Sequence, residues 1–236
     1  MNILAVETST EYCSVALWQD GVVRERCEHV GQKHSEVLLQ MLDTLLKEAG
    51  CTMQDVDGIA FGKGPGSFTG VRIACGVTQG LALGAGVGVV GVCTLEALAG
   101  ASGQDKVIAA LDARMGELYF AAYEKRNDEW EEVIAPCLCK AEDAPVLSGK
   151  GWFGVGNGFA AGAPTPSPSP TGRGGLAQSY ALQLVGVDDK AVPRASAVAR
   201  IAARSFARGD AVDAALALPL YLRDKVALTT RERAAK

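Results

Sequence analysis

Residues 61–73, which read FGKGPGSFTGVRI, constrain the fold of this chain more than any other stretch. They continue a largely apolar run over 56–61 that is typical of a buried strand. Thr69 and Gly70 then lead into a helix, with Thr69 as the expected N-cap. The glycines between strand and helix let the backbone turn sharply and approach its neighbours closely. The sequence therefore predicts a strand, a glycine turn and a helix in immediate succession.

This glycine turn has two interpretations. Free N–H groups at a helix N-terminus attract negative charge, so the turn can hold an anion, with Lys63 and Arg72 on either side of it. It can equally be a tight connection that binds nothing. It is not a Walker A motif, because Lys63 is followed by Gly64 where that motif requires Ser or Thr.

The two halves of the chain begin with the same order of expected elements. Strands at 2–6 and 13–19 are joined by a turn that opens with Glu7. Two further strands within 107–123 are joined by a turn that opens with Asp112. We therefore expect an internal duplication. The chain has 236 residues, 48% of them hydrophobic, which suffices for one large domain or two small ones.

Two expected helices carry residues suited to contact with another protein. The helix over 35–49, with Ser35 as its N-cap, has more apolar side chains than one core-facing stripe requires. The helix over 69–83 is rich in small residues, which let helix backbones approach closely. We expect a partner surface made of Val37, Met41 and Leu45 from the first helix and Gly70, Ala74, Gly76, Val77 and Gly80 from the second.

Composition argues against several classes of protein. The net charge is −4, so the chain lacks the basic surplus of proteins that grip nucleic acid by themselves. Its seven cysteines include no C-x-x-C pair, which is typical of reduced thiols in a cytoplasmic protein. We expect no secretory leader, because Glu7 interrupts the first apolar run.

Residues 73–95 carry no charge and place Gly76, Gly80 and Gly84 at G-x-x-x-G spacing. That pattern is compatible with a membrane span that dimerises through its glycines. The glycines at 84–86 and the β-like run over 87–92 favour a helix, a turn and a buried strand instead. We therefore expect no membrane span.

Several polar residues leave alternatives open. Glu7, Asp112 and Glu117 stand at turns, where they could form a nucleotide–metal site or accept hydrogen bonds from local amides. A helix over 194–208 places Arg200, Arg204 and Arg208 on one face, which is either solvated or binds phosphate.

The proline-rich stretch over 163–175 disfavours regular structure and predicts an exposed insertion. Such a segment is either a spacer or a docking peptide for another protein.

Seven segments together resemble the TsaB (YeaZ) family: LAVETS at 4–9, CSVAL at 13–17, HSE at 34–36, GPGSFTGVR at 64–72, QGLA at 79–82, LDARMGE at 111–117 and YLR at 221–223. The resemblance covers most of the chain and weakens between 152 and 191. It implies an α/β, actin-like/Hsp70-like ATPase (ASKHA) fold of two lobes with mixed sheets flanked by helices. The expected division is an N-terminal lobe over 1–106, a C-terminal lobe over 107–218 with the insertion, and a tail over 219–236.

The resemblance also implies a role in forming threonylcarbamoyladenosine beside the anticodon of tRNAs that read codons starting with A. In that family the catalytic subunit is the paralogue TsaD, which transfers the threonylcarbamoyl group from threonylcarbamoyl-adenylate, and the ATPase TsaE joins them. This chain is then expected to be a non-catalytic subunit that positions a TsaD-like protein. It is expected to form a homodimer when alone and to meet tRNA only indirectly.

The sequence departs from two patterns of this superfamily. The metal site of the paralogue resembles VHHMEGH, whereas residues 92–98 here read VCTLEAL, so Thr94 and Leu98 replace two histidines. Neither side chain can supply an imidazole nitrogen, so we expect no bound metal and no catalytic residue. Nucleotide binders of the superfamily resemble D-x-G-[ST] in the first turn, where this chain has ETST at 7–10 without the glycine.

We therefore expect no tightly held cofactor, although weak or shared nucleotide binding stays open. The residues that would form a nucleotide or anion site are Glu7, Thr8, Lys63, Arg72 and Asp112. The alternative function is a nucleotide-dependent transferase or ATPase that uses Glu7, Asp112 and the turn over 62–70.

Overall fold

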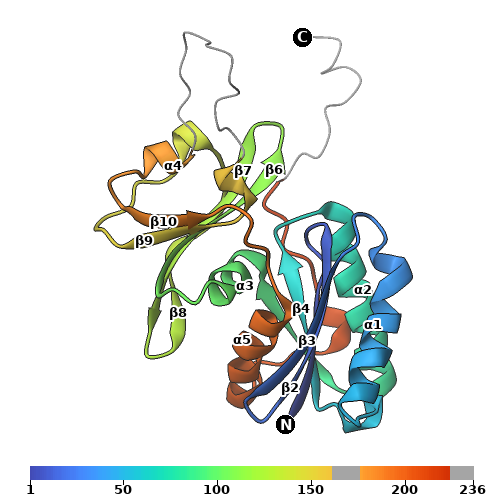
Figure 1. Cartoon of the computed structure of the whole chain (residues 1–236). Helices are drawn as coiled ribbons and strands as arrows, with labels where there is room; N and C mark the ends of the chain where they lie inside the picture. The colour runs from blue at the N-terminus through green and yellow to red at the C-terminus, as the bar shows by residue number, and fades with distance from the viewer. Residues whose placement is uncertain (161–175, 224–236) are drawn as a thin grey trace, which may run out of the picture.

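The computed structural model describes residues 1–160 and 176–223, which form two lobes (Figure 1). Each lobe contains one five-stranded mixed sheet. The predicted insertion over 163–175 and the end of the predicted tail, over 224–236, lie outside the described residues.

The first sheet has the strand order β3-β2-β1-β4-β5. β1 pairs antiparallel with β2 and parallel with β4, β2 pairs antiparallel with β3, and β4 pairs parallel with β5. Its strands are β1 (Asn2–Glu7), β2 (Tyr12–Gln19), β3 (Val22–His29), β4 (Gly58–Gly64) and β5 (Gly88–Cys93).

The second sheet has the strand order β10-β9-β6-β7-β8. Read from its other edge, as β8-β7-β6-β9-β10, it repeats the arrangement of the first sheet. β6 takes the place of β1, with an antiparallel partner in β7 and a parallel partner in β9. Because both topology and strand direction repeat, the predicted internal duplication is confirmed. The strands are β6 (Lys106–Arg114), β7 (Glu117–Arg126), β8 (Glu129–Lys140), β9 (Trp152–Val155) and β10 (Leu184–Asp188).

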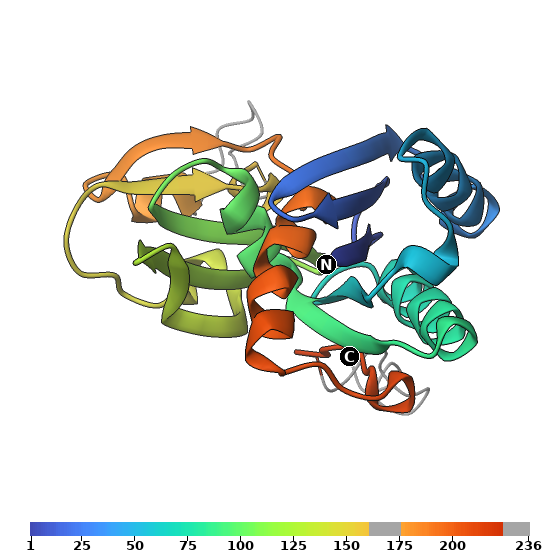
Figure 2. The ribbon, with the colours of Figure 1, turned by 90° about the horizontal axis from the view of Figure 1, so that it is seen from below.

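Helices cover both faces of the first sheet, which explains why β1 is almost continuously apolar. Successive side chains of a strand point to opposite faces. Leu4 and Val6 pack with helices α1 (His34–Glu48) and α2 (Phe68–Ala85). Ile3 and Ala5 pack with α5 (Ala195–Arg208) on the other face, and Figure 2 shows α5 across the sheet from α1 and α2.

The remaining helices are short. α3 (Thr94–Ala101) contacts strands of both sheets, and α4 (Leu176–Ser179) belongs to the second lobe. The 3₁₀ turns are η1 (Met53–Asp55), η2 (Ala141–Asp143), η3 (Asn157–Phe159) and η4 (Ala214–Leu216).

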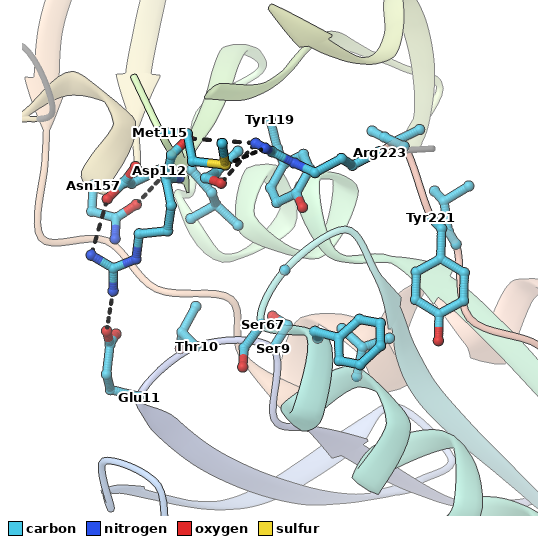
Figure 3. Close-up of a pocket in the computed structure, with 18 of the residues that line it drawn as sticks. Ser9, Thr10, Glu11, Ser67, Asp112, Met115, Tyr119, Asn157, Tyr221 and Arg223 are labelled. Atoms are coloured by element: carbon cyan, nitrogen blue, oxygen red, sulfur yellow. Dashed lines mark hydrogen bonds and ion pairs between the residues drawn. The ribbon is translucent and has the colours of Figure 1, made fainter. Parts of the chain in front are cut away.

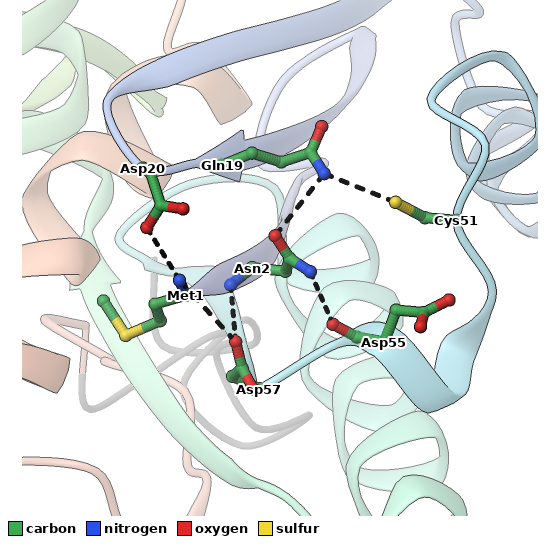
Figure 4. A network of polar contacts seen from close by, with 7 residues as sticks. All are labelled: Met1, Asn2, Gln19, Asp20, Cys51, Asp55 and Asp57. Carbon is green, nitrogen blue, oxygen red and sulfur yellow. Dashed lines mark hydrogen bonds and ion pairs between the residues drawn. The ribbon is translucent and has the colours of Figure 1, made fainter.

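Polar contacts fix the edge of the first lobe where β1 begins (Figure 4). The amide of Asn2 donates to Asp57 at 2.7 Å, and the Asn2 side chain donates to the carbonyl of Asp55 at 2.7 Å. The terminal ammonium lies 2.7 Å from Asp20. The two bonds of Asn2 hold the loop before β4 against β1 and so support the parallel pairing of the two strands.

The structure corrects three details of the sequence-based reading. α1 begins at His34, so Ser35 lies inside the helix instead of capping it. α2 begins before Thr69, and Ser67 is its N-cap, accepting from the amide of Gly70. The C-terminal lobe is not continuous over 107–218, because α5 returns to pack on the first sheet through its alanine-rich face.

Residues 73–95 form most of α2, then β5 and the first residues of α3. None of the helices described within residues 1–160 and 176–223 combines the length and hydropathy needed to cross a membrane.

Candidate functional site

A cavity of about 440 Å³ lies between the two lobes (Figure 3). Its walls come from the first turn, the start of α2, the β6–β7 turn and the chain after η4. The polar and aromatic lining residues include Ser9, Thr10, Glu11, Ser67, Phe68, Asp112, Arg114, Tyr119, Asn157, Tyr221 and Arg223. Segments far apart in the sequence thus meet at one place.

The first turn presents Ser9 and Thr10 to this cavity, whereas Glu7 and Thr8 are buried and are not among its described lining residues. Glu7 Oε1 accepts from the amide of Ser9 at 2.6 Å, and Oε2 lies 3.5 Å from the Thr94 hydroxyl. Burial raises the pKa of Glu7, and the hydrogen bonds from Ser9 oppose that shift. Thr8 donates to the carbonyl of Gly70 at 2.7 Å.

An ASKHA fold implies a nucleotide in such a cleft, but the side chains of Glu7 and Thr8 do not fit its phosphates or metal ion. A Cβ at Gly62 would overlap the Glu7 carboxylate, so that carboxylate packs against the backbone of β4. Both side chains are held by internal groups and serve to join β1 to its neighbours.

The glycine turn also uses some of its polar groups internally. The amide of Ser67 donates to the carbonyl of Ser9 at 2.7 Å, and the amide of Val71 donates to the carbonyl of Ser67 at 2.9 Å. Gly66 packs against Ser9 so closely that a Cβ would collide with its carbonyl. Close packing between the segment after β1 and the start of α2 therefore accounts for Gly66 without a bound anion.

The two basic residues beside the turn point elsewhere. Lys63 packs along Gly91 of β5, and its charge acts on Glu96 of α3. The Arg72 guanidinium lies 3.4 Å above the ring of Phe68 and donates from Nε to the Tyr221 hydroxyl at 2.7 Å. Neither is among the described lining residues of the cavity.

Asp112 is the member of the five-residue candidate set that lines the cavity. Its carboxylate accepts from the amide of Arg114 at 2.8 Å and lies 3.3 Å from the Arg114 guanidinium. Its own amide donates to Asn157 at 2.8 Å. The structure therefore does not bring Glu7, Thr8, Lys63, Arg72 and Asp112 together as one site.

Sequence reasoning missed Ser9, Tyr119 and Asn157 as cavity residues, because their segments become neighbours only in the folded chain. The pair Tyr221 and Arg223 had a signal in the YLR motif, but no role was assigned to it.

The two positions that distinguish this chain from the metal-binding pattern are buried. Thr94 donates to Glu7, and Leu98 belongs to the apolar cluster around α3 and β6. Within residues 1–160 and 176–223, no three His, Cys, Asp or Glu side chains gather in a way that could hold a metal ion.

We predict that the purified chain holds no iron or zinc and has no threonylcarbamoyl-transfer activity alone, because Thr94 and Leu98 offer no imidazole. Elemental analysis after dialysis against a chelator checks the first part, and a transfer assay with tRNA checks the second. About one equivalent of metal retained against the chelator would contradict the prediction.

The predicted partner surface is reduced by burial. Four of these residues are buried inside the first lobe and cannot contact a partner directly: Met41, Leu45, Gly70 and Ala74. Val37 and Val77 are half-buried, whereas Gly76 and Gly80 are exposed.

The exposed faces of α1 and α2 lie side by side (Figures 1 and 2) and carry an unusual combination of residues. Leu39 of α1 is 57% exposed and Leu83 of α2 is 80% exposed. A Cβ added at Gly76, Gly80 or Gly84 would meet nothing within 4 Å, so these glycines form an open stripe that no internal contact explains.

The family model described as "TsaD: tRNA N6-adenosine threonylcarbamoyltransferase" matches residues 15–229. The chain is 40% identical to the tRNA threonylcarbamoyladenosine biosynthesis protein TsaB of Escherichia coli K12, over 96% of each chain. It belongs to the TsaB (YeaZ) family.

Other relatives agree with this assignment. The TsaB protein of Haemophilus influenzae is 35% identical over 96% of this chain and 95% of its own length. The structure of YeaZ from Pseudomonas aeruginosa matches with a TM-score of 0.81 at 36% identity, covering 94% of this chain and 99% of that one. The ASKHA-like fold implied by the sequence resemblance to TsaB is thereby confirmed.

Proposed function

We propose that this chain is a non-catalytic scaffold subunit of a complex that forms threonylcarbamoyladenosine in tRNA. It would bind a TsaD-like paralogue and position it for threonylcarbamoyl transfer to the adenosine beside the anticodon. Its relatives TsaB of E. coli and H. influenzae carry the name of that biosynthesis. The proposal includes a cytoplasmic location, a homodimer when the chain is alone, a TsaE-like ATPase in the complex and only indirect contact with tRNA.

The observation that carries the proposal is the open glycine stripe on α2, with exposed Leu83 on the same helix. Small residues allow the backbone of a partner helix to come close, so that many dispersion contacts form at once. Leu83, exposed next to Gly84, supplies apolar area for the same interface.

A second observation opposes the alternative of a nucleotide-dependent transferase or ATPase. That function needs the Glu7 carboxylate to reach its ligand, and here the side chains of Glu7 and Thr8 are enclosed by the protein. Magnesium-ATP turnover by the isolated chain would favour the alternative. Weak nucleotide binding shared with the partner remains part of the proposal.

The interface is tested by Gly76→Leu and Gly80→Leu. A Cβ at either exposed position meets nothing within 4 Å, and each replacement raises helix propensity, so thermal stability should not fall. Each should lower the affinity for the TsaD-like paralogue about a hundredfold, close to 2.7 kcal/mol, by blocking backbone approach. Titration calorimetry measures the affinity, and circular dichroism checks the fold.

Ala207→Leu is the matched control, because Ala207 is exposed on α5, across the sheet from α1 and α2. It should leave the affinity unchanged. Ala74→Trp is unsuitable as a test, because Ala74 is fully buried and a Trp there would overpack the core. Unchanged affinity in both glycine variants would rule out this surface.

A further inference from the structure

Residues 220–223, here called the strap, run from the first lobe to the second along the inter-lobe cavity. The strap begins at the end of β4, where the amide of Leu220 donates to the carbonyl of Lys63 at 2.6 Å. The backbones approach so closely that a Cβ at Gly64, whose φ is +101°, would lie 2.9 Å from the carbonyl oxygen of Leu220. Glycine is therefore required at position 64 for the strap to reach β4.

The next anchor of the strap is an aromatic clasp on the first turn of α2. The ring of Tyr221 lies 6.0 Å from that of Phe68, and the Arg72 guanidinium lies over both rings, at 3.4 Å from Phe68 and 5.4 Å from Tyr221. The hydrogen bond from Arg72 Nε to the Tyr221 hydroxyl fixes the orientation of the clasp. Arg72 and Tyr221 are therefore joined both by a cation–π contact and by a hydrogen bond.

Two residues later the strap is held by the second lobe. Arg223 forms an ion pair with Glu117 at 2.7 Å and donates to the carbonyl of Ala113 at 3.0 Å. Its side chain is only 14% exposed, so this contact is shielded from solvent. Figure 3 shows Arg223 reaching to the β6–β7 turn, with Tyr221 on the other side of the cavity beside α2.

We propose that the strap is an internal clamp that couples the start of α2 to the β6–β7 turn of the second lobe. Adjacent Cα atoms are about 3.8 Å apart, so the short link between Tyr221 and Arg223 cannot lengthen to follow separating lobes. The lobes can then move apart only when one anchor is released. The chain itself, instead of a ligand in the cavity, sets the relative position of the lobes.

This inference concerns the isolated chain and holds whether or not α1 and α2 bind a paralogue. Its test is hydrogen exchange of the full-length protein carrying Arg223→Ala. Loss of the guanidinium should speed exchange near 112–118, where it makes direct contact. The clamp further requires that exchange near 68–72 speeds up about fivefold or more, although the described hydrogen bonds and ion pairs of Arg223 go to the second lobe. Coupling is reciprocal, so Tyr221→Ala should likewise speed exchange near 112–118.

Arg126→Ala is the control, since Arg126 also forms ion pairs, with Glu124 and Glu131 of its own lobe, and is not among the described lining residues of the cavity. It should change neither region. If Arg223→Ala fails to fold, Arg223→Lys keeps the charge and loses the forked geometry, and the same two regions are compared. Faster exchange confined to 112–118, or no change in either region, would overturn the clamp.

Discussion

Gly70→Ala is expected to destabilise the protein by about 3 kcal/mol, because it overpacks a rigid contact. A Cβ at this position would collide with the backbone carbonyl oxygen of Thr8, and Thr8 in turn donates to the carbonyl of Gly70. Relief requires a shift of α2 away from β1. For a chain of this size the melting temperature should fall by roughly 6–12 °C in calorimetry.

Gly76→Ala on the same helix is the matched control. Its Cβ would enter open space, so the variant should be neutral or gain up to about 1 kcal/mol from helix propensity. Equal melting temperatures for Gly70→Ala and the unmodified protein would show that α2 and the first turn are not in rigid contact.

Glu96→Gln is expected to raise the free energy of unfolding at pH 8 by up to about 3 kcal/mol more than it does below pH 4.5. Burial on α3 and the charge of Glu132 raise the pKa of Glu96 from 4.5 to about 7, against the opposing charges of Lys63, Arg204 and Arg208. Because the folded state holds this proton more tightly than the unfolded state, stability falls as the pH rises from about 4.5 to about 7. Glutamine stays neutral and removes that loss.

Urea unfolding of both proteins at pH 4 and pH 8 gives the effect of the substitution on the free energy of unfolding at each pH, and the difference between the two effects is the predicted quantity. Glu142→Gln, at an exposed position in η2, is the control and should show little dependence on pH. A stabilisation by Glu96→Gln that is the same at both pH values would mean that Glu96 is ionised throughout this range.

The regular elements could be predicted well from the sequence wherever the apolar residues followed a single strand-like or helix-like period. The meander of β1, β2 and β3 and the order strand, glycine turn, helix at β4 and α2 follow from local patterns. The caps were placed less well, because Ser67 and Thr69 are both good N-cap residues. Contact between Ser67 and the carbonyl of Ser9, which no local pattern shows, decided between them.

Helix faces were harder to predict than helices. The leucines and small residues of α1 and α2 suggested one large partner surface, yet Met41, Leu45 and Ala74 serve the core of the lobe. Composition alone cannot separate a residue that packs on its own sheet from one that packs on another protein. Gly70 and Gly76 lie on the same helix, but a Cβ at Gly70 would collide with the carbonyl oxygen of Thr8, whereas a Cβ at Gly76 would enter open space.

The family, the two duplicated halves and the replacement of two histidines by Thr94 and Leu98 could all be predicted from the amino-acid sequence, because they are properties of residue identity and spacing. The tertiary structure alone decided that Glu7 and Thr8 are enclosed, that Arg72 belongs to an aromatic clasp, and that Tyr221 and Arg223 join the lobes. The physical reason is distance along the chain. Arg72 and Tyr221 are separated by 149 residues, and contacts of that span are set by the packing of whole lobes.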